Sequence, residues 1–581
     1  MRYKSISLIH NIYLKRSGAN CMNKKRDNMN AIPKSMEGIL KDNPKMRIPI
    51  FQRDYSWKRD NWKELWNDIK IGFSNDCKHY LGSIVLVEND DFMEVVDGQQ
   101  RLTTISLLYL AIISNFNELI NNKIDVQQNI TRSQDIKKLI CETNLYDISS
   151  TNKLQLNENN NMVYSEYLVK DKLPSATVNL TSSNKLLVDC FKYFKREIKK
   201  ACTEEGEKNQ SFKLLLDYYR FICDKLIIIE ITASDYNNAY VIFETLNDRG
   251  LDLTVTDLLK NYLFSKIDSS RHPEIKKYWN DIIKNVDEKN ATKFIRHYWN
   301  SYNTKVTEKG LFKIIKENLY SQDKIIKFIN KLNEVSEIYK SLSEPKSNLW
   351  NGDKILVQSL KEIKLYGVDL CYPVLLAAQN NLSNLKLKQK IFRLCSNISF
   401  RYIVICNGSA NDLERAYNTL CLKINNDKDS LDFSKVTKDL KEFLVPRDEF
   451  IASFTNKIIK TKNNKRLITY ILKGIERNRG SEIKEDHTIE HILPEKYNQK
   501  WNEIFNNEAE EYIYRLGNYV LLEKEVNSDI GNELFENKKV GYNKSVYSGP
   551  HKISSFDKWT SKELKKHQQE MGKIAECVWS L

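Results

Sequence analysis

A polar segment of sequence DGQQR lies between a predicted strand and a predicted helix, and it comprises Asp97, Gly98, Gln99, Gln100 and Arg101. Free backbone N–H groups at the start of a helix attract anions, and a glycine lets the backbone approach a ligand closely. The arginine can donate paired hydrogen bonds to phosphate oxygens. The glutamines can orient a water or hold a sugar or phosphate, and the aspartate can bind a cation or position a water. The segment predicts a phosphate-binding turn, although an ordinary Asp-Gly turn that caps a helix has the same composition.

Two further polar segments are embedded in apolar and aromatic sequence. Gln52 and Arg53 lie within IPIFQRDYSW, residues 48–57, and FETLNDRGLDL, residues 243–253, forms a polar turn after a predicted helix. Two charged residues follow on the next predicted helix, Asp257 and Lys260. Three such segments predict one shared pocket, and each is also compatible with a local capping network. The chain has no G-x-x-x-x-G-K-[ST] loop, which excludes a P-loop NTPase.

The segment HTIEHILP, residues 487–494, supports two alternative interpretations. In the first, His487 and His491 lie four residues apart on a helix and bind zinc, but the β-branched residues and Pro494 disfavour that helix. In the second, a short strand presents Glu490 and His491 at its end. The second interpretation fits a nuclease site.

A second strand, residues 516–523, and then a helix are predicted downstream. In a one-metal nuclease, Glu490 and Asn527 would supply hard oxygen ligands for Mg²⁺ or Mn²⁺, and His491 would be the general base for the attacking water. The metal would stabilise charge on the phosphate and on the leaving 3′ oxygen. Asn518 is expected to fix the loop or the histidine ring. Lysines on the predicted helix can hold the scissile or a flanking phosphate: Lys538 and Lys539.

Basic residues cluster on both sides of these segments. Runs of charge are usually solvated faces, but clustering on both sides of a candidate active site favours contacts with DNA phosphates, which give affinity without sequence specificity. We assign Lys465 and Arg466 to the DNA-binding surface, together with the two lysines above. The other members of the clusters are Lys457, Lys460, Lys462, Lys473, Arg477, Arg479, Lys558, Lys562, Lys565, Lys566 and His567.

The elements that must position these residues follow from hydrophobic periodicity. Residues 81–90 and 92–98 predict two strands of a hairpin, and residues 102–120 predict a buried helix. The β-branched run at 226–232 predicts another strand, and residues 274–444 read as almost entirely helical. We therefore expect a mainly α protein with α+β modules. Its predicted parts are a flexible leader (1–30), an N-terminal α+β domain (31–270), a helical connector (271–445) and a C-terminal domain (446–581).

The composition predicts a basic globular protein. Its 91 Lys+Arg against 76 Asp+Glu give a net charge of +15, which favours a polyanionic partner such as nucleic acid. The 11 cysteines contain no C-x-x-C pair, which disfavours a structural zinc site and indicates reduced thiols in the cytoplasm. No apolar run of about 18 residues occurs, so no membrane span is expected. The basic N-terminus does not resemble a signal peptide.

The phrases IPIFQRDYSW, VVDGQQRLTT and IFETLNDRGLDLTVTDLLKN resemble the domain of unknown function family 262, in the same order and spacing. FIRHYW, residues 294–299, resembles the trailing helix of that family. The resemblance implies a ParB-like, sulfiredoxin-like fold of the kind found in modification-dependent restriction enzymes of the GmrSD type. It also implies nucleotide binding and hydrolysis by all five residues of the DGQQR segment, with Gln52 and Arg53 beside them.

The phrases IEHILP, LGNYVLLEKEVN and NELFENKKVGYNKS resemble the domain of unknown function family 1524, an HNH-type (His-Me finger) nuclease with a ββα-metal fold. That family's Glu-His, Asn and Asn carry over to Glu490, His491, Asn518 and Asn527. Together the two resemblances imply an NTP-dependent, metal-dependent endonuclease of antiviral defence. Its partners would be double-stranded, modified DNA and a nucleoside triphosphate, and it could form a homo-oligomer.

Two other functions stay open at this point. One is a nuclease toxin whose N-terminal pocket binds a nucleotide only as a regulator, without turning it over. The other is a non-catalytic DNA-binding protein, since the ParB-like fold also serves partition proteins. The combination of Glu490, His491, Asn518 and Asn527 argues against the second of these.

Overall fold

A computed structural model describes residues 30–89, 92–143, 150–175, 177–204, 211–234, 236, 238–239, 242, 254–427 and 430–580. The chain divides into two compact units. The first contains Met1–His272 with Tyr320–Gln322, and the second contains Pro273–Leu319 with Asp323–Leu581. The segments predicted as a connector and a C-terminal domain therefore belong to one compact unit. The predicted leader lies outside the described residues, apart from its last position.

The first unit combines one large sheet with a group of helices. Its strands are β1 (Asn30–Ser35), β2 (Met46–Arg47), β3 (His79–Asn89), β4 (Phe92–Asp97), β5 (Cys141–Thr143), β6 (Ser150–Asn152), β7 (Leu154–Gln155) and β8 (Leu226–Ala233). Its helices are α2 (Met36–Asp42), α3 (Arg59–Ser74), α4 (Gln99–Asn121), α5 (Val126–Ile140), α6 (Glu158–Val163), α7 (Ser182–Glu204), α8 (Ser211–Lys225) and α10 (Val255–Ser265), with a π-helical turn at Tyr164–Leu168 and a 3₁₀ turn at Ser269–Arg271.

The sheet is mixed, with the strand order β1-β8-β3-β4-β2-β7. The predicted hairpin is confirmed, because β3 and β4 pair in antiparallel fashion, with Asn89 opposite Phe92. The predicted strand at 226–232 is β8, which pairs in parallel with β3 and antiparallel with β1. The hairpin therefore occupies the middle of the sheet, and β4 delivers its last residue, Asp97, to the start of α4.

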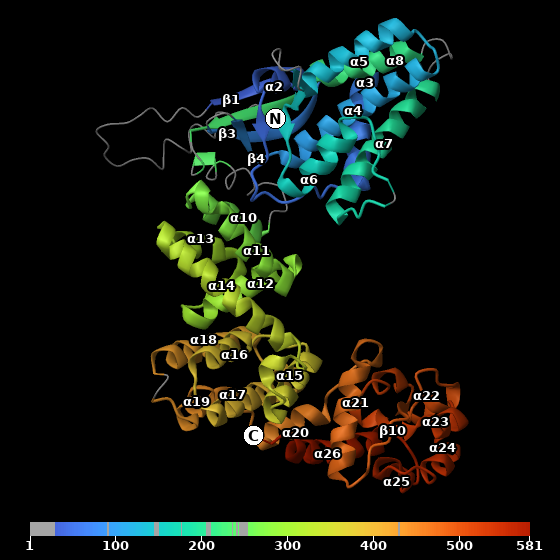
Figure 1. The fold of residues 1–581 in the computed structure, drawn as a ribbon. Coiled ribbons are helices and arrows are strands. Elements are labelled where there is room, and N and C mark those ends of the chain that lie inside the picture. The colour runs from blue at the N-terminus through green and yellow to red at the C-terminus, as the bar shows by residue number, and fades with distance from the viewer. Residues whose placement is uncertain are drawn as a thin grey trace. The chain divides into compact units, whose positions relative to one another are not determined.

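The predicted buried helix is α4, which packs against α5, α7 and α8 in the helical layer of this unit (Figure 1). Most of its first 18 positions are buried. The helix carries β-branched, leucine and aromatic side chains on all of its faces, and a helix that is apolar all round is buried in the core. By length and composition this helix could cross a membrane, but 78% of its apolar window is buried inside the protein, as in the core helix of a globular domain. Among the described residues it is the one helix that meets the criterion.

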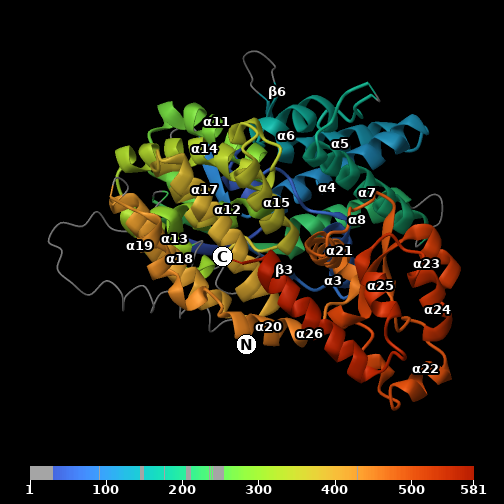
Figure 2. The same ribbon diagram turned by 90° about the horizontal axis from the view of Figure 1, so that it is seen from below.

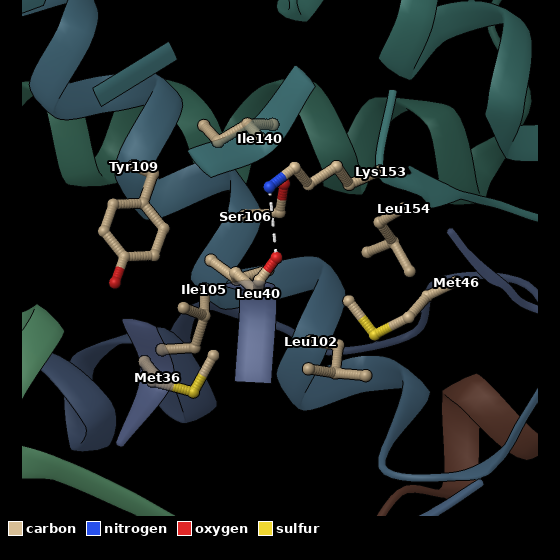
Figure 3. Close-up of a pocket in the computed structure, with 10 residues that line it drawn as sticks. All are labelled: Met36, Leu40, Met46, Leu102, Ile105, Ser106, Tyr109, Ile140, Lys153 and Leu154. Atoms are coloured by element: carbon tan, nitrogen blue, oxygen red, sulfur yellow. Dashed lines mark hydrogen bonds between the residues drawn. The ribbon is translucent and has the colours of Figure 1, made fainter. Parts of the chain in front are cut away.

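A small cavity lies beside the first three turns of α4, and Figure 3 shows its mostly apolar lining. Its volume is about 10 Å³, which is enough for one water at most. The ammonium group of Lys153 reaches into it and donates to the carbonyl of Leu40 at 3.1 Å. This cavity completes the core beneath the helix and is too small for an organic ligand.

The second unit is helical except for one short hairpin. Its helices are α11 (His272–Val286), α12 (Glu288–Tyr302), α13 (Glu308–Asn318), α14 (Gln322–Ser343), α15 (Lys354–Tyr366), α16 (Tyr372–Asn381), α17 (Leu385–Ile398), α18 (Ala410–Asn426), α19 (Phe433–Asp439), α20 (Arg447–Thr455), α21 (Thr461–Asn478), α22 (Gln499–Ile504), α23 (Lys524–Ile530), α24 (Phe535–Tyr542), α25 (Ser548–Ser554) and α26 (Ser561–Val578). A π-helical turn covers Ser399–Ile405, and 3₁₀ turns cover Asn348–Trp350, Lys441–Phe443, Ala509–Glu511 and Leu516–Asn518. The strands are β9 (His487–His491) and β10 (Tyr519–Glu523).

The last helix of the chain, α26, contacts both the helices before the β9–β10 hairpin and the hairpin region itself. It packs along α20 and α21 and contacts the turn Leu516–Asn518 before β10 (Figure 2). At its C-terminal end, Trp579 packs on Phe400 with ring centroids 4.6 Å apart. The whole chain is thus mainly α with α+β modules, as predicted.

Candidate functional site

The turn between β4 and α4 is built around Gly98. Its φ of +87° lies in the left-handed region that favours glycine. A Cβ atom at this position would lie 2.4 Å from Cγ2 of Ile84 on β3. No side chain caps the helix, and its first turn contains no acidic residue. The first N–H groups of α4 are therefore left for a ligand or for water.

The IPIFQRDYSW and DGQQR segments come together at this turn. The side-chain amide of Gln52 donates to the carbonyl of Val96 at 2.9 Å. Gln100 accepts from the backbone N–H of Ser56 at 2.8 Å and donates to the carbonyl of Asp54 at 3.1 Å. The structure thus confirms that these two segments share one place in the fold.

Two polar atoms at this place are buried without a hydrogen-bond partner: Nε of Arg53 and Oε1 of Gln99. Burial raises the pKa of Asp97, while Arg101, the N–H of Gly98 and Arg53 lower it. Unsatisfied buried donors and acceptors are costly, and an incoming phosphate or sugar would satisfy them. The residues present therefore fit a nucleotide in donor and acceptor chemistry.

Arg101 is held from the other side of the turn. Its Nη1 donates to the carbonyl of Ser83 at 2.7 Å, and its guanidinium group packs against Gly82. The third polar segment, residues 243–253, lies outside the described residues. The helix that follows it, α10, reaches the site through Phe264, whose ring lies 5.4 Å from that of Phe51.

The HTIEHILP segment forms a strand and not a helix. β9 pairs in antiparallel fashion with β10, with His491 opposite Tyr519 and His487 opposite Glu523. Four residues of strand span about 13 Å, too far for two histidines to share one zinc ion. Among the described residues, no group of three His, Cys, Asp or Glu side chains could hold a metal. The zinc interpretation is therefore wrong, and the strand interpretation is confirmed.

Glu490 points into the protein and meets two side chains of α24. Its Oε1 lies 2.6 Å from Nζ of Lys538 and accepts a hydrogen bond from the hydroxyl of Tyr542 at 2.9 Å. The Lys538 ammonium also donates to the backbone carbonyl of His491 at 2.9 Å. Burial raises the pKa of Glu490 and lowers that of Lys538, and their mutual attraction opposes both shifts.

His491 lies at the end of β9 with its side chain 16% exposed. Its ring packs edge-on against Tyr519, with centroids 4.9 Å apart. Nε2 lies 3.2 Å from Oε1 of Glu495 but makes no hydrogen bond in the structure. Burial lowers the pKa of this histidine to about 4, with Glu495 opposing the shift and Lys538 adding to it. The imidazole is therefore neutral at physiological pH and able to accept a proton.

The two asparagines brace the strand and the loop after it. Asn518 is fully buried; its side chain accepts from the N–H of Leu493 at 2.8 Å and donates to the carbonyls of Leu493 and Ile513. It therefore fixes the loop, one of the two roles predicted for it. Asn527, on α23, donates to the carbonyl of Ile489 at 3.4 Å and so lies beside β9.

Glu490 and Asn527 are oxygen donors of the type that a divalent metal ion takes. Mg²⁺ is commonly bound through one or two protein oxygens, with water and phosphate oxygens completing the octahedron, and Glu490 and Asn527 are oxygen donors beside the same strand. The ammonium of Lys538 already compensates the carboxylate through Oε1, so a metal would have to share Glu490 with this lysine. Glu490 and His491 lie on β9 and Asn527 lies on α23, so the packing of α23 against β9 positions the three side chains.

The four basic residues predicted to bind DNA have different surroundings. Lys538 is fully buried, so its ammonium group faces Glu490 and not solvent. Lys539 is half-buried and donates to the carbonyl of Phe556 at 2.9 Å. Lys465 and Arg466 are exposed on α21, and within the described part of the chain neither makes an ion pair. Lys538 and Lys539 differ because they lie on different faces of α24. The face that carries Lys538 packs against the β9–β10 hairpin.

Three partners of the site residues escaped the sequence reasoning: Glu495, Tyr519 and Tyr542. Glu495 follows Pro494, and only the turn after β9 brings it back to the imidazole. Tyr519 is next to Asn518, but its contact with His491 follows from the register of the hairpin. Tyr542 lies four residues after Lys538 on the same helix, a spacing that was visible in the sequence.

Comparisons with known families agree with this arrangement. A family model for the N-terminal domain of GmrSD restriction endonucleases matches residues 36–264. A model for the C-terminal domain of GmrSD restriction endonucleases matches residues 445–574. The first match covers the sheet except β1, together with α4. The second covers the β9–β10 hairpin and the helices around it. No curated protein sequence shows significant similarity to the chain.

Proposed function

The chain belongs to the GmrSD restriction endonuclease family and is a DNA endonuclease, and from this premise we propose that it cleaves modified foreign DNA in antiviral defence, using one divalent metal ion and a nucleoside triphosphate. The observation that carries the proposal is the partly buried imidazole of His491 at the end of β9, whose Nε2 has no hydrogen-bond partner, beside Glu490, Asn527 and the loop braced by Asn518.

The proposed nuclease chemistry assigns one task to each side chain. His491 takes a proton from the attacking water, because its low pKa keeps it unprotonated. Glu490 and Asn527 would hold a Mg²⁺ or Mn²⁺ ion, which would supply charge stabilisation for the phosphate and the leaving 3′ oxygen. Asn518 positions the histidine through the loop that follows it. Lys538 orients the carboxylate of Glu490, and Lys465, Arg466 and Lys539 are the candidates for DNA phosphate contacts.

The proposed nucleotide site lies at the start of α4. The uncapped N–H groups of the helix and the buried Nε of Arg53 are donors for phosphate oxygens. Gln99 offers an unused acceptor for a sugar hydroxyl or a water. Asp97 is close enough to Arg101 and Arg53 for both to lower its pKa, and its proposed role is to orient a water for attack on the terminal phosphate. The proposal is therefore binding and hydrolysis of a nucleoside triphosphate at this turn, without a P-loop.

A cleavage assay tests the proposal directly. Purified protein is incubated with unmodified, glucosylated, methylated and phosphorothioated DNA, each with and without NTP and Mn²⁺. We expect cleavage of at least one modified DNA that needs both additions, and a loss of about 10³-fold or more in the His491→Ala variant. His487→Ala is the matched control, since that histidine lies at the far end of β9. Equal cleavage by wild type and His491→Ala would refute the assignment of the base.

A further inference from the structure

A second cavity lies in the helical part of the second unit, between α17 and α19, which pack side by side (Figure 1). Its volume is about 430 Å³, within the range of pockets that bind small organic ligands. The apolar part of its lining consists of Ile355, Leu394, Phe433 and Leu444. Neither the nuclease site nor the nucleotide site contributes a residue to it.

Three cations of α17 line this cavity at positions i, i+4 and i+7, which share one face of a helix: Lys386, Lys390 and Arg393. Arg393 is neutralised, because its Nη1 lies 2.9 Å from a carboxylate oxygen of Glu362. The ammonium of Lys390 lies over the ring of Phe433, 5.1 Å from its centroid. Within the described part of the chain, neither lysine has an ion-pair partner.

Two carboxylates that contact residues of the lining, Asp353 and Glu362, are already engaged. Asp353 accepts from Gln389 at 2.7 Å and caps the first turn of α15. Besides Arg393, Glu362 accepts from Ser396 at 2.6 Å and from Tyr470 at 3.1 Å. Two lysines at an apolar cavity thus remain uncompensated, which favours an anionic ligand with an apolar or aromatic body.

The cavity is connected to the nuclease site through α26. Asn397, which lines the cavity, donates to the carbonyl of Ser580 at 3.1 Å. Near the other end of that helix, His567 contacts the carbonyl of Gly517, next to Asn518. An 18-residue helix is about 27 Å long, so the contacts near its two ends are separated by less than the length of about ten base pairs of DNA.

We infer that this cavity is a second DNA contact of the enzyme, which takes up one nucleotide unstacked from the strand. The base lies against Phe433, and the flanking phosphates lie on Lys386 and Lys390. Lys390 exchanges its contact with the ring for a phosphate, which exposes the aromatic face for stacking. Stacking on an aromatic side chain accepts any base, and the cost of unstacking is offset by the contacts in the pocket.

The aromatic half of the site is tested by substitution of Phe433. Binding of a fluorescently labelled duplex to the full-length protein is measured by anisotropy, without metal or NTP so that the DNA stays intact. We expect Phe433→Ala to weaken binding about 10- to 100-fold. Phe433→Leu keeps the apolar volume without the stacking surface and is expected to weaken binding similarly, which separates lost stacking from lost folding. Wild-type affinity in Phe433→Leu would contradict the inference.

The cationic half is tested by charge reversal. We expect the double variant Lys386→Glu/Lys390→Glu to bind DNA at least 10-fold more weakly, with a salt dependence of the affinity that is about two counterions shallower. The matched control is Lys309→Glu/Lys327→Glu, which changes the same charge at exposed positions of the same unit. An equal loss in the control would show that only the net charge matters and would overturn the inference.

A free nucleotide offers the same chemistry as a nucleotide in a strand, so dAMP is titrated as a separate arm. Weak or no binding of dAMP, with DNA binding sensitive to the Phe433 substitutions, supports the DNA assignment. Tight dAMP binding that is lost in Phe433→Ala, while DNA affinity stays at the wild-type value, would overturn it in favour of a free ligand.

Discussion

At the scale of single residues, the buried pair of Glu490 and Lys538 decides how the nuclease site is organised. Two charges without solvent contact are tolerated only when they are paired and hydrogen-bonded. Here Tyr542 and the carbonyl of His491 supply the additional hydrogen bonds. Lys538 is therefore a positioning residue that ties α24 to β9.

Removal of this lysine is expected to be costly for stability. In Lys538→Met the carboxylate of Glu490 stays buried without its cation, and the free energy of unfolding should fall by about 3–5 kcal/mol. Chemical denaturation measures the change. The control is Lys539→Met, the next residue of α24, which should lower the free energy of unfolding by less than about 1 kcal/mol. The double variant Lys538→Met/Glu490→Gln should recover part of the loss, because it removes the buried charge of the glutamate. Equal losses in the two methionine variants would contradict the role of the pair.

Burial of His491 also predicts how stability depends on pH. Its folded pKa of about 4 lies below the unfolded value near 6.5, so between these values the unfolded chain binds the additional proton. The free energy of unfolding is therefore not reduced by this group above pH 6.5, and it falls as the pH is lowered from 6.5 towards 4. Over this range the titration of His491 lowers the free energy of unfolding by about 3 kcal/mol.

The pH prediction is checked by denaturation of wild type and His491→Gln at pH 7 and pH 4. His567 is also buried and its pKa is likewise lowered to about 4, so the wild type loses stability through more than one histidine. The difference between the two proteins isolates His491: the variant should lose less stability over this range. A variant that loses as much as the wild type would show that the imidazole titrates normally.

At the scale of elements, the turn between β4 and α4 depends on the absence of a side chain at position 98. The backbone conformation there favours glycine, and the neighbouring strand leaves no room for a Cβ. The start of α4 lies beside the segment that carries Arg53, as the hydrogen bonds of Gln52 and Gln100 show. The geometry of the proposed nucleotide site therefore depends on the packing of the β3–β4 hairpin against the start of α4.

Gly98→Ala should lower the stability of the first unit by about 2–4 kcal/mol, because left-handed strain adds to the clash with Ile84. Thermal unfolding measures the change. Gly352→Ala is the control: φ is +69° there, but nothing lies within 4 Å of the added methyl, so only the strain of about 1–2 kcal/mol is expected. Equal losses in the two variants would show that the contact with Ile84 is unimportant.

At the scale of the whole molecule, the two proposed activities belong to different compact units. The nucleotide turn lies in the first unit and the nuclease hairpin in the second. Each activity is therefore expected to be removable by itself, and the dependence of one on the other can be measured in the intact chain.

Arg101→Ala should abolish release of phosphate from NTP, whereas His491→Ala should leave it at the wild-type rate. Phosphate release is measured for both variants and wild type in the presence of DNA. If cleavage also fails in Arg101→Ala, turnover drives the nuclease. If neither wild type nor Arg101→Ala releases phosphate while cleavage still responds to NTP, the nucleotide acts as a regulator, and NTPase activity is ruled out.

Sequence patterns predict the local elements and the order of the polar segments. The hairpin of β3 and β4, the apolar helix α4 and the strand β10 follow from short-range periodicity, which depends only on neighbouring side chains. For β9 the sequence left a helix open as an alternative, which the β-branched residues and Pro494 disfavoured. The partners of these residues follow only from the way the elements pack. Lys538 is buried and not on a DNA-facing surface because α24 turns that position towards Glu490, and Glu495 reaches His491 only through the turn after Pro494. Such contacts depend on how the elements pack. The hydrophobic periodicity of one helix or strand shows which of its own faces is buried, but it does not show which face of another element packs against it.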